Sequence, residues 1–431
     1  MASIIETRYG RIEGRETENC FAFLGVPYAK PPVGDLRFHA PQTLEPWEGV
    51  IQAEHFGNRS MQRDNHDGDF YGREFFSDPA FIPPMSEDCL YLNIWTPKDA
   101  TRASVAIWYH GGGFQNGHGS EPEFDGEAFA KRGVILVTVN YRLGFLGYFC
   151  HPALRDKSGH SGNYGFLDQI AALNWVRENI SAFGGDPDCI TIFGQSAGGM
   201  AVRDLVCSPM VKGNVKRAIL QSCNGYKGPL KVDFTMEQME KISERFLQRK
   251  KLTVSELKSL PADAVLKLQQ EYNRYAAFRT RAGISLTPVI DGWALPVNPD
   301  RAAEQGETAR IQYLTGSTKH DLTVSRAGVK DPGKSKLQKS LMRWSGTHTK
   351  QGLTSYSYHF GRELPGDRAG AFHSSELWYV FGTLSRCWRP MTEHDYALST
   401  RMTDAWAAFI KTGDPGWEPC GGENGFYFEF E

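Results

Sequence analysis

The sequence predicts an α/β fold in which a mostly parallel central sheet is flanked by helices. Several short runs rich in β-branched residues are continuously apolar, which is typical of strands buried on both faces of a parallel sheet. These runs alternate along the chain with stretches whose apolar residues recur at helical spacing. That alternation builds strand–helix–strand units, so we expect right-handed crossovers and helices on both faces of the sheet.

The expected parallel strands are five apolar runs, and a helix separates two of them. Between the second and third runs, residues 166–180 repeat apolar side chains at steps of three and four, which is one face of a helix. A further strand-like run covers residues 356–360. The five runs lie at residues 105–109, 134–139, 190–193, 218–220 and 311–314.

Two segments depart from this alternation. Residues 234–279 are rich in Lys, Glu, Gln and Leu and carry no strand signal, so we expect a helical insertion there, with its movement as a lid left open. Residues 326–350 are basic and predict a short helix flanked by loops. A chain of 431 residues can form one large α/β domain, so we expect a single domain over residues 1–431.

Composition excludes several classes of partner. The formal net charge is −2, which argues against a nucleic-acid-binding surface and gives no reason for binding anionic membranes. No apolar run is long enough to span a bilayer, and none follows the first residues as in a signal peptide. Eight cysteines occur without a CxxC pair, so we expect reduced thiols in the cytoplasm. The oligomeric state is left open.

A serine motif marks the expected reaction centre. GQSAG at 194–198 follows the strand at 190–193 and precedes a helix expected at 199–206. In that context the motif is a nucleophile elbow, a tight turn that exposes the hydroxyl of Ser196 above the sheet edge. The helix that begins there directs free N–H groups at developing negative charge.

A glycine loop follows another strand. HGGGF at 110–114 comes directly after the strand at 105–109. Consecutive glycines let the backbone approach a substrate closely, and preorganised N–H donors stabilise the oxyanion formed in acyl transfer. We expect the N–H groups of Gly112, Gly113 and Ala197 to be these donors, although a simple glycine-rich turn gives the same pattern.

A serine nucleophile needs a base and an orienting carboxylate, which follow in the chain order Ser, acid, His. His373 lies in a loop after the strand-like run at 356–360, so it is the expected base. Asp321 lies just past the strand at 311–314 and is the expected acid, although a helix cap explains a lone Asp there equally well. Asp291 competes, but Asp-Gly after Val-Ile indicates a turn.

These motifs together resemble the type-B carboxylesterase family, the cholinesterase-like branch of the α/β-hydrolases. The resemblance covers most of residues 9–229 and 284–417 and implies serine-esterase chemistry, with Ser196 as nucleophile, His373 as base and Asp321 where the family usually has Glu. It also includes FLGVPYA at 23–29, PPVGDLRF at 31–38, EDCLYLNIWTP at 87–97, GNYGFLDQ at 162–169, FGGDP at 183–187, AFHSSE at 371–376 and KTGDP at 411–415.

The sequence also departs from that family. Ser60 stands where the family usually has the disulfide partner of Cys89, so this bridge is expected to be missing. Gln195 replaces the Glu of cholinesterases, and the loop at 62–87 has no Trp to hold a cation, which argues against choline esters. The acid and the base lie closer in sequence than is usual, so we expect a more open pocket.

The expected function is hydrolysis of carboxylic esters through an acyl-enzyme, without a metal or organic cofactor. If His373 is the base, kcat/KM should rise through about pH 6–7. Phe75 and Phe76 in the loop at 62–87, with Phe114 and Gln195, are expected to contact the substrate, although the aromatic residues could instead anchor the loop. Alternatives are an esterase for feruloyl or other aromatic acyl esters, an acyl-sugar esterase, and a non-catalytic cholinesterase-like interaction domain.

Overall fold

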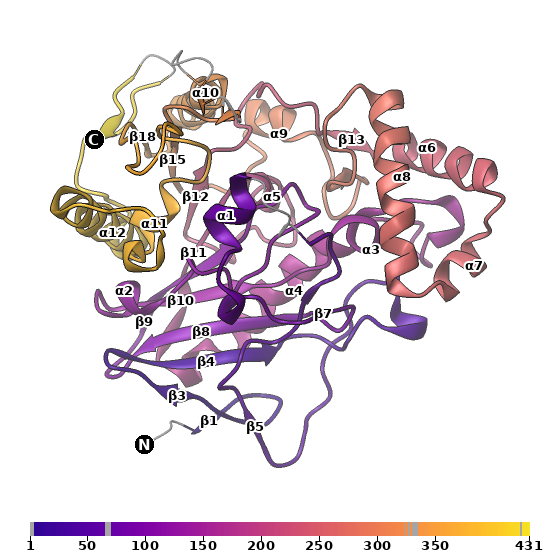
Figure 1. Ribbon diagram of the computed structural model, residues 1–431, viewed down its shortest axis with the longest axis horizontal. Coiled ribbons are helices and arrows are strands. Elements are labelled where there is room, and N and C mark those ends of the chain that lie inside the picture. The colour runs from indigo at the N-terminus through magenta and orange to yellow at the C-terminus, as the bar shows by residue number, and fades with distance from the viewer. Residues whose placement is uncertain (1–3, 65–69, 323, 326–327, 330–334, 423–424) are drawn as a thin grey trace.

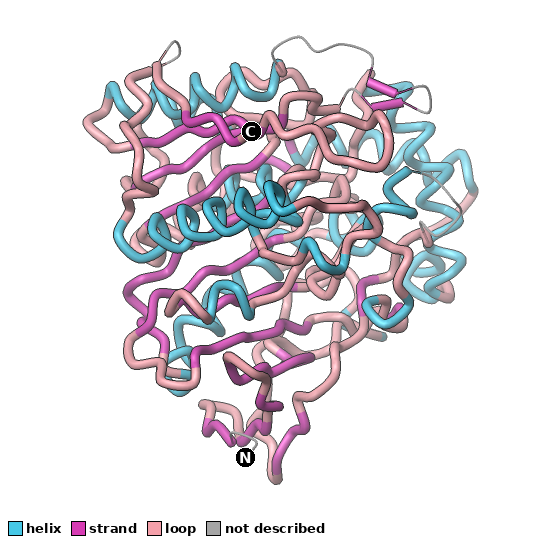
Figure 2. Tube along the Cα trace, turned by 60° about the vertical axis from the view of Figure 1, so that its left-hand side comes forward, coloured by secondary structure: helices cyan, strands magenta, loops and turns pink. Residues whose placement is uncertain are grey.

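A twisted ten-stranded sheet organises the molecule (Figures 1 and 2). The computed structural model describes residues 4–64, 70–322, 324–325, 328–329, 335–422 and 425–431. The strand order is β19-β18-β15-β12-β11-β9-β10-β8-β4-β3. Pairing is parallel from β10 through to β19, and antiparallel where β8, β4 and β3 extend the other edge.

The sheet strands are β3 (Arg15–Glu16), β4 (Cys20–Pro27), β8 (Tyr91–Pro97), β9 (Ala103–Tyr109), β10 (Val134–Val139), β11 (Gly185–Gln195), β12 (Arg217–Gln221), β15 (Gln312–Thr318), β18 (Ser355–Phe360) and β19 (Phe428–Phe430). The smaller sheets use β1 (Ile4–Glu6), β2 (Arg11–Glu13), β5 (Val50–Gln52), β6 (Arg59–Ser60), β7 (Met85–Ser86), β13 (Phe234–Thr235), β14 (Val289–Ile290), β16 (Val324–Ser325) and β17 (Gly328–Val329).

The helices are α1 (Phe70–Phe75), α2 (Glu127–Ala130), α3 (Gly144–Tyr148), α4 (Tyr164–Asn179), α5 (Ala197–Leu205), α6 (Met236–Lys250), α7 (Val254–Ser259), α8 (Ala262–Thr280), α9 (Pro299–Gln305), α10 (Lys336–Lys350), α11 (Leu377–Val380) and α12 (Glu393–Thr412). Among the described residues, none of these helices has the length and apolar character needed to cross a bilayer.

Alternation along the strands divides the core into two layers. On β9, Ala106 and Trp108 pack with α2, α11 and α12, whereas Val105 and Ile107 pack with α3, α4 and α5. Successive side chains of a strand point to opposite faces, so a continuously apolar run must be covered on both sides. The expected α/β architecture is therefore confirmed: the five expected strands are β9, β10, β11, β12 and β15, and the helix expected at 166–180 is α4.

The segment expected to be helical at 234–279 contains α6, α7 and α8, preceded by the two-residue strand β13. Figure 1 shows these helices grouped at one end of the molecule. Thr235 and Thr253 begin α6 and α7 with capping boxes. The helix expected within 326–350 is α10, while residues 326–327 and 330–334 lie outside the described residues.

The topology brings the sequence motifs to one edge of the sheet. β9, β11, β15 and β18 run parallel, so their carboxyl ends meet at the same edge. The glycine loop follows β9, GQSAG follows β11, Asp321 follows β15, and His373 lies in the connection after β18. In open α/β sheets this edge is where ligands bind.

Candidate active site

Ser196 lies in a strained turn between β11 and α5. Its backbone has φ 57° and ψ −123°, a conformation that a residue with a side chain seldom adopts. Gly194 and Gly198 make the turn possible, since a Cβ at Gly194 would lie 2.4 Å from the Gly198 carbonyl carbon, and one at Gly198 would lie 1.9 Å from Tyr109 O. The Ser196 N–H donates to Gln221 O at 2.9 Å, which ties the turn to β12.

The glycine loop lies directly against this turn. A Cβ at Gly111 would lie 3.2 Å from Ser196 Cβ, and both Gly112 and Gly113 have positive φ, at 95° and 65°. The loop is fixed from within, because Gln115 and Asn116 each donate a backbone hydrogen bond of 3.0 Å to Gly112 O.

The N–H groups expected to stabilise an oxyanion remain available. Among the described residues, none accepts a hydrogen bond from the N–H of Gly112, Gly113 or Ala197. Ala197 begins α5, so its N–H also lies at the positive end of that helix. Donors that are already in place require no reorganisation when negative charge develops on a substrate oxygen.

His373 and Asp321 form a buried pair. The Nδ1 of His373 makes a short hydrogen bond with Asp321 Oδ1, and Asp321 Oδ2 has no hydrogen-bond partner among the described residues. Burial alone would lower the pKa of His373, but the charge and hydrogen bond of Asp321, with the charge of Glu376, raise it above its ordinary value. This is the pairing expected of a base and its orienting acid.

The loops that carry Asp321 and His373 are joined next to this pair. The His320 N–H donates to Ala371 O at 2.9 Å, and the Ala371 N–H donates to His320 Nδ1 at 3.0 Å. His320 also forms a parallel bridge with Phe372. These contacts place the residues adjacent to Asp321 and His373 side by side. Asp291, the competing acid, accepts hydrogen bonds from Trp293 N and Leu295 N in a turn, which agrees with its interpretation as a turn residue.

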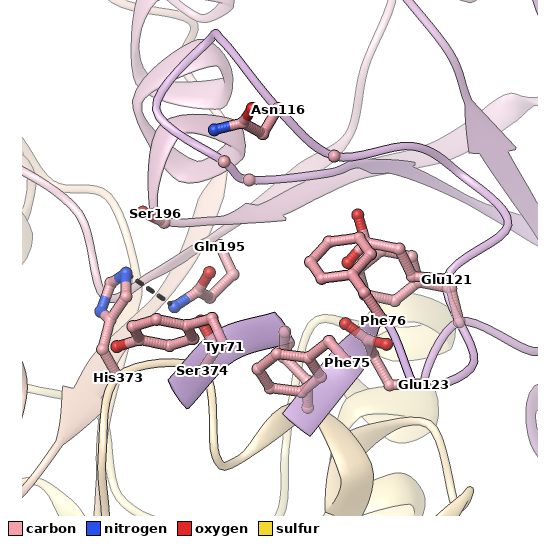
Figure 3. Close-up of a pocket in the computed structure, with 15 residues that line it drawn as sticks. Tyr71, Phe75, Phe76, Asn116, Glu121, Glu123, Gln195, Ser196, His373 and Ser374 are labelled. Carbon is pink, nitrogen blue, oxygen red and sulfur yellow. Dashed lines mark hydrogen bonds between the residues drawn. The ribbon is translucent and has the colours of Figure 1, made fainter. Parts of the chain in front are cut away.

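The second ring nitrogen of His373 faces Gln195. Its Nε2 lies 3.3 Å from Gln195 Nε2 (Figure 3). With Nδ1–H donating to Asp321, Nε2 carries the lone pair and accepts from the Gln195 amide. Ser196 and His373 line the same cavity, but among the described residues no hydrogen bond joins the Ser196 hydroxyl to the imidazole. The structure thus brings Ser196, His373 and Asp321 together, but the hydrogen bond between Ser196 and His373 is not formed.

A cavity of about 320 Å³ opens above this site. Ser196 and His373 lie on one side of it, and α1 contributes aromatic rings to its wall (Figure 3). The complete lining is Tyr71, Phe75, Phe76, Gly111, Gly112, Asn116, Gly117, Glu121, Glu123, Phe124, Gln195, Ser196, His373, Ser374 and Leu377. Within the described part of the chain, no group of three or more His, Cys, Asp or Glu side chains could hold a metal ion.

Three of the four residues expected to contact substrate line this cavity. Phe75, Phe76 and Gln195 do so, whereas Phe114 is 1% exposed and packs edge-on against Tyr148 at 5.2 Å. The expectation for Phe114 is therefore wrong. Its backbone has φ 58°, and its ring belongs to the hydrophobic core. Residues 65–69 of the aromatic loop lie outside the described residues.

Three buried carboxyl groups near the site were not predicted from the sequence. Glu121 and Glu123 line the cavity, and Glu376 lies close to Asp321 and His373. Burial, followed by the charge of Asp321, raises the pKa of Glu376 to about 7. Two signals could have found them, since Glu121 and Glu123 follow the glycine loop in SEPEF and Glu376 ends the AFHSSE motif.

The position of Ser60 matches the departure noted in the sequence. Ser60 forms a side-chain hydrogen bond with the Cys89 thiol, and burial raises the pKa of Cys89 to about 12. The Ser60 hydroxyl also donates to Tyr141 O at 2.5 Å. Polar contacts to Ser60 therefore fill the place where the family has a disulfide.

Comparison with known proteins agrees with this geometry. A family model described as "Carboxylesterase family" matches residues 1–344 and 333–431. The chain is 34% identical to para-nitrobenzyl esterase of Bacillus subtilis, over 96% of this chain and 91% of that protein. It is 32% identical to fumonisin B1 esterase of Sphingopyxis macrogoltabida, over 95% of this chain and 82% of that protein.

Solved structures give the same result. A para-nitrobenzyl esterase structure superposes with a TM-score of 0.83 at 31% identity, covering 97% of this chain and 94% of the other. The matches confirm the predicted fold and the predicted class of enzyme, a serine carboxylic ester hydrolase. This chain belongs to the carboxylesterase family.

Proposed function

We propose that Ser196, His373 and Asp321 hydrolyse carboxylic esters as nucleophile, general base and orienting acid. The observation that carries this proposal is the buried hydrogen bond between His373 and Asp321, because His373 lines the same cavity as Ser196 in its strained turn. The neutral imidazole then holds its proton on Nδ1 and presents Nε2 to the cavity, as a base for a hydroxyl requires.

The reaction follows from these positions. His373 Nε2 exchanges its contact with Gln195 for the Ser196 hydroxyl and takes its proton as the oxygen attacks the ester carbonyl. The N–H groups of Gly112, Gly113 and Ala197 bind the resulting oxyanion. Protonated His373 then gives its proton to the leaving alcohol, and a water molecule activated by the same nitrogen releases the acid.

Covalent labelling tests the nucleophile. An organophosphonate should modify Ser196 with a stoichiometry of one and abolish hydrolysis of p-nitrophenyl acetate. Ser196→Ala should resist labelling and lose at least about 10³-fold in kcat. Ser181→Ala, at an exposed position in the short 3₁₀ helix that follows α4, is the matched control and should keep both properties. Full activity of Ser196→Ala would refute the proposal.

Aromatic acyl esters are a second, narrower candidate, because α1 places Tyr71, Phe75 and Phe76 in the cavity wall. Phe75 also stacks on Trp378 at 5.6 Å, so it supports α1, whereas Phe76 faces His118 across the loop. Phe76→Ala should therefore lower kcat/KM for methyl ferulate relative to methyl acetate by about tenfold. If the ratio of kcat/KM between the two esters is unchanged, Phe76 only anchors the loop and does not select the substrate.

We also propose a reducing cellular compartment, the cytoplasm. All eight cysteines are free, and Ser60 stands opposite Cys89 in place of a disulfide partner. Alkylation of the protein in cells, followed by mass measurement under denaturing conditions, should find every thiol modified. Recovery of an oxidised pair would contradict this placement.

A further inference from the structure

The cavity wall opposite the reacting residues carries two carboxyl groups that ester hydrolysis does not use. Glu121 and Glu123 are 7% and 1% exposed, yet both line the cavity. Figure 3 shows them on the far side of the cavity from Ser196 and His373. They belong to the chain that leaves the glycine loop, so the element that holds the oxyanion donors also positions them.

The protein does not supply a hydrogen-bond partner for every oxygen of these carboxyl groups. Glu121 Oε1 accepts a hydrogen bond of 2.8 Å from the His118 N–H, and the two glutamates hydrogen-bond to each other. Glu123 Oε2 is buried and has no partner among the described residues. A buried acceptor without a donor costs free energy. Glu123 also lines the cavity, so a molecule bound there is the nearest source of a further donor.

The pair also lacks an ion-pair partner that would favour its charged form, since in the described part of the chain no ion pair joins Glu121 or Glu123 to a cationic side chain. Arg59 is close enough to act on Glu121 electrostatically, but its guanidinium bonds Asp64 at 2.7 Å and Pro83 O at 2.9 Å. Burial raises the pKa of Glu121 to about 7, and burial followed by the charge of Glu121 raises the pKa of Glu123.

Aromatic rings complete this part of the wall. Phe76 and Phe124 line the cavity together with the glutamates, and Tyr71 lies nearer His373. The faces of such rings attract cations, whereas carboxylates accept hydrogen bonds from N–H donors. A group that carries both positive charge and N–H donors can interact favourably with the ring faces and with the carboxyl oxygens. A neutral hydroxyl supplies no charge, and a quaternary ammonium supplies no donor.

We propose that Glu121 and Glu123 form a subsite for a primary ammonium group carried by the ester substrate. This inference rests on the proposed function, because the ammonium must belong to a molecule whose ester reaches Ser196. The subsite would select amino-substituted esters over neutral esters of the same length.

Matched substrates test the subsite. On the acyl side, p-nitrophenyl 6-aminohexanoate is compared with p-nitrophenyl heptanoate, and on the alcohol side, 5-aminopentyl acetate with hexyl acetate. In at least one pair the wild-type enzyme should favour the amine, and E121Q/E123Q should lower the amine-to-neutral ratio of kcat/KM at least tenfold. D125N neutralises a carboxylate of the same loop that pairs with Arg386 outside the cavity lining, so it should keep the wild-type ratio.

Two further measurements keep the outcome decisive. If the double variant does not fold, judged by titration of Ser196 with an organophosphonate, E123Q alone replaces it. Hexylammonium should inhibit wild-type hydrolysis of p-nitrophenyl acetate at least tenfold more strongly than 1-hexanol. Equal inhibition, or ratios that the variants leave unchanged in both substrate pairs, would overturn the subsite. Failure of the proposed function is distinguishable, since the wild-type enzyme would then hydrolyse none of the four esters.

Discussion

Ser196, the proposed nucleophile, carries backbone strain. Its positive φ holds the hydroxyl at the cavity surface, while its N–H remains bonded to β12. Strain of this kind costs about 1–3 kcal/mol and persists only where neighbouring structure enforces it. Here the enforcement comes from two glycines that let the turn, the following helix and β9 approach more closely than side chains allow.

The proposed role of His373 as general base predicts the pH dependence of the reaction. Since its pKa is raised above the ordinary value of 6.5, kcat/KM should rise with pH around a midpoint above 6.5 as the imidazole loses its proton. This places the midpoint at or beyond the upper part of the range expected from the sequence.

Asp321→Asn should lower that midpoint, because the carboxylate that stabilises the imidazolium is gone. It should also reduce kcat by about 10⁴-fold, because the imidazole tautomer is no longer fixed. Rate profiles on p-nitrophenyl acetate from pH 5 to pH 9 check both effects. A midpoint that stays in place in the variant would show that Asp321 does not act on His373.

At the level of elements, the approach of α5 to β9 depends on a missing side chain. Gly198→Ala would place a methyl group 1.9 Å from Tyr109 O, so the elbow must move away from the glycine loop. We expect a loss of about 2–3 kcal/mol in the free energy of unfolding, measured with urea, and a large loss of kcat. Gly283→Ala meets no atom within 4 Å and is the matched control, with a change below about 1 kcal/mol.

Helix α1 is held in the cavity wall by a buried ion pair. Glu74 accepts hydrogen bonds from Arg389 Nε at 2.9 and 3.1 Å and from Trp388 Nε1 at 2.9 Å, and the side chains of Glu74 and Arg389 are fully buried. Arg389 also bonds Asp367 at 2.8 Å. The pair therefore fastens the aromatic wall to the C-terminal part of the chain.

Glu74→Gln should lower the free energy of unfolding by about 3 kcal/mol, because it leaves a buried guanidinium without its full compensation. Asp404→Asn breaks an ion pair whose carboxylate is 61% exposed, so it should cost about 1 kcal/mol or less. Urea titrations of both variants make the comparison. Equal losses would show that the Glu74 pair contributes no more than a surface contact.

The sequence predicted the parallel part of the sheet better than its antiparallel edge. Doubly buried strands such as β10 are continuous apolar runs of β-branched residues. By contrast, β8 includes the polar residues Asn93 and Thr96, and β4 contains Gly25 and ends at Pro27, which weaken a strand signal.

The proposed triad could be found in the sequence because Ser196 and Asp321 come just after strands and His373 lies in the connection that follows another strand. Glu121 and Glu123 follow the glycine loop, but their burial was not expected, since acidic residues usually face solvent. In the folded chain they line the cavity together with Phe76 and Phe124.

On the scale of the whole molecule, buried carboxyl groups make stability depend on pH. Unfolded Glu376 ionises near its ordinary pKa of 4.5, while folded Glu376 keeps its proton until about pH 7. Between these values the folded state binds more protons than the unfolded state, so the free energy of unfolding falls as pH rises through this window.

Glu376→Gln should remove about 3 kcal/mol of that fall between pH 4.5 and pH 7, since the amide does not titrate. Urea unfolding at pH 5 and pH 8 measures the difference, with the exposed Glu418→Gln as control. A variant with the parent's full pH dependence would show that Glu376 does not keep its proton.

The reciprocal hydrogen bonds between His320 and Ala371 have a mechanical consequence. They hold Asp321 and His373 together between the loops that follow β15 and β18, whereas Ser196 follows β11. In the proposed reaction, the contact that still has to form is the one between Ser196 Oγ and His373 Nε2. A bound substrate can complete it by displacing the Gln195 amide, while the hydrogen bond between His373 and Asp321 stays in place.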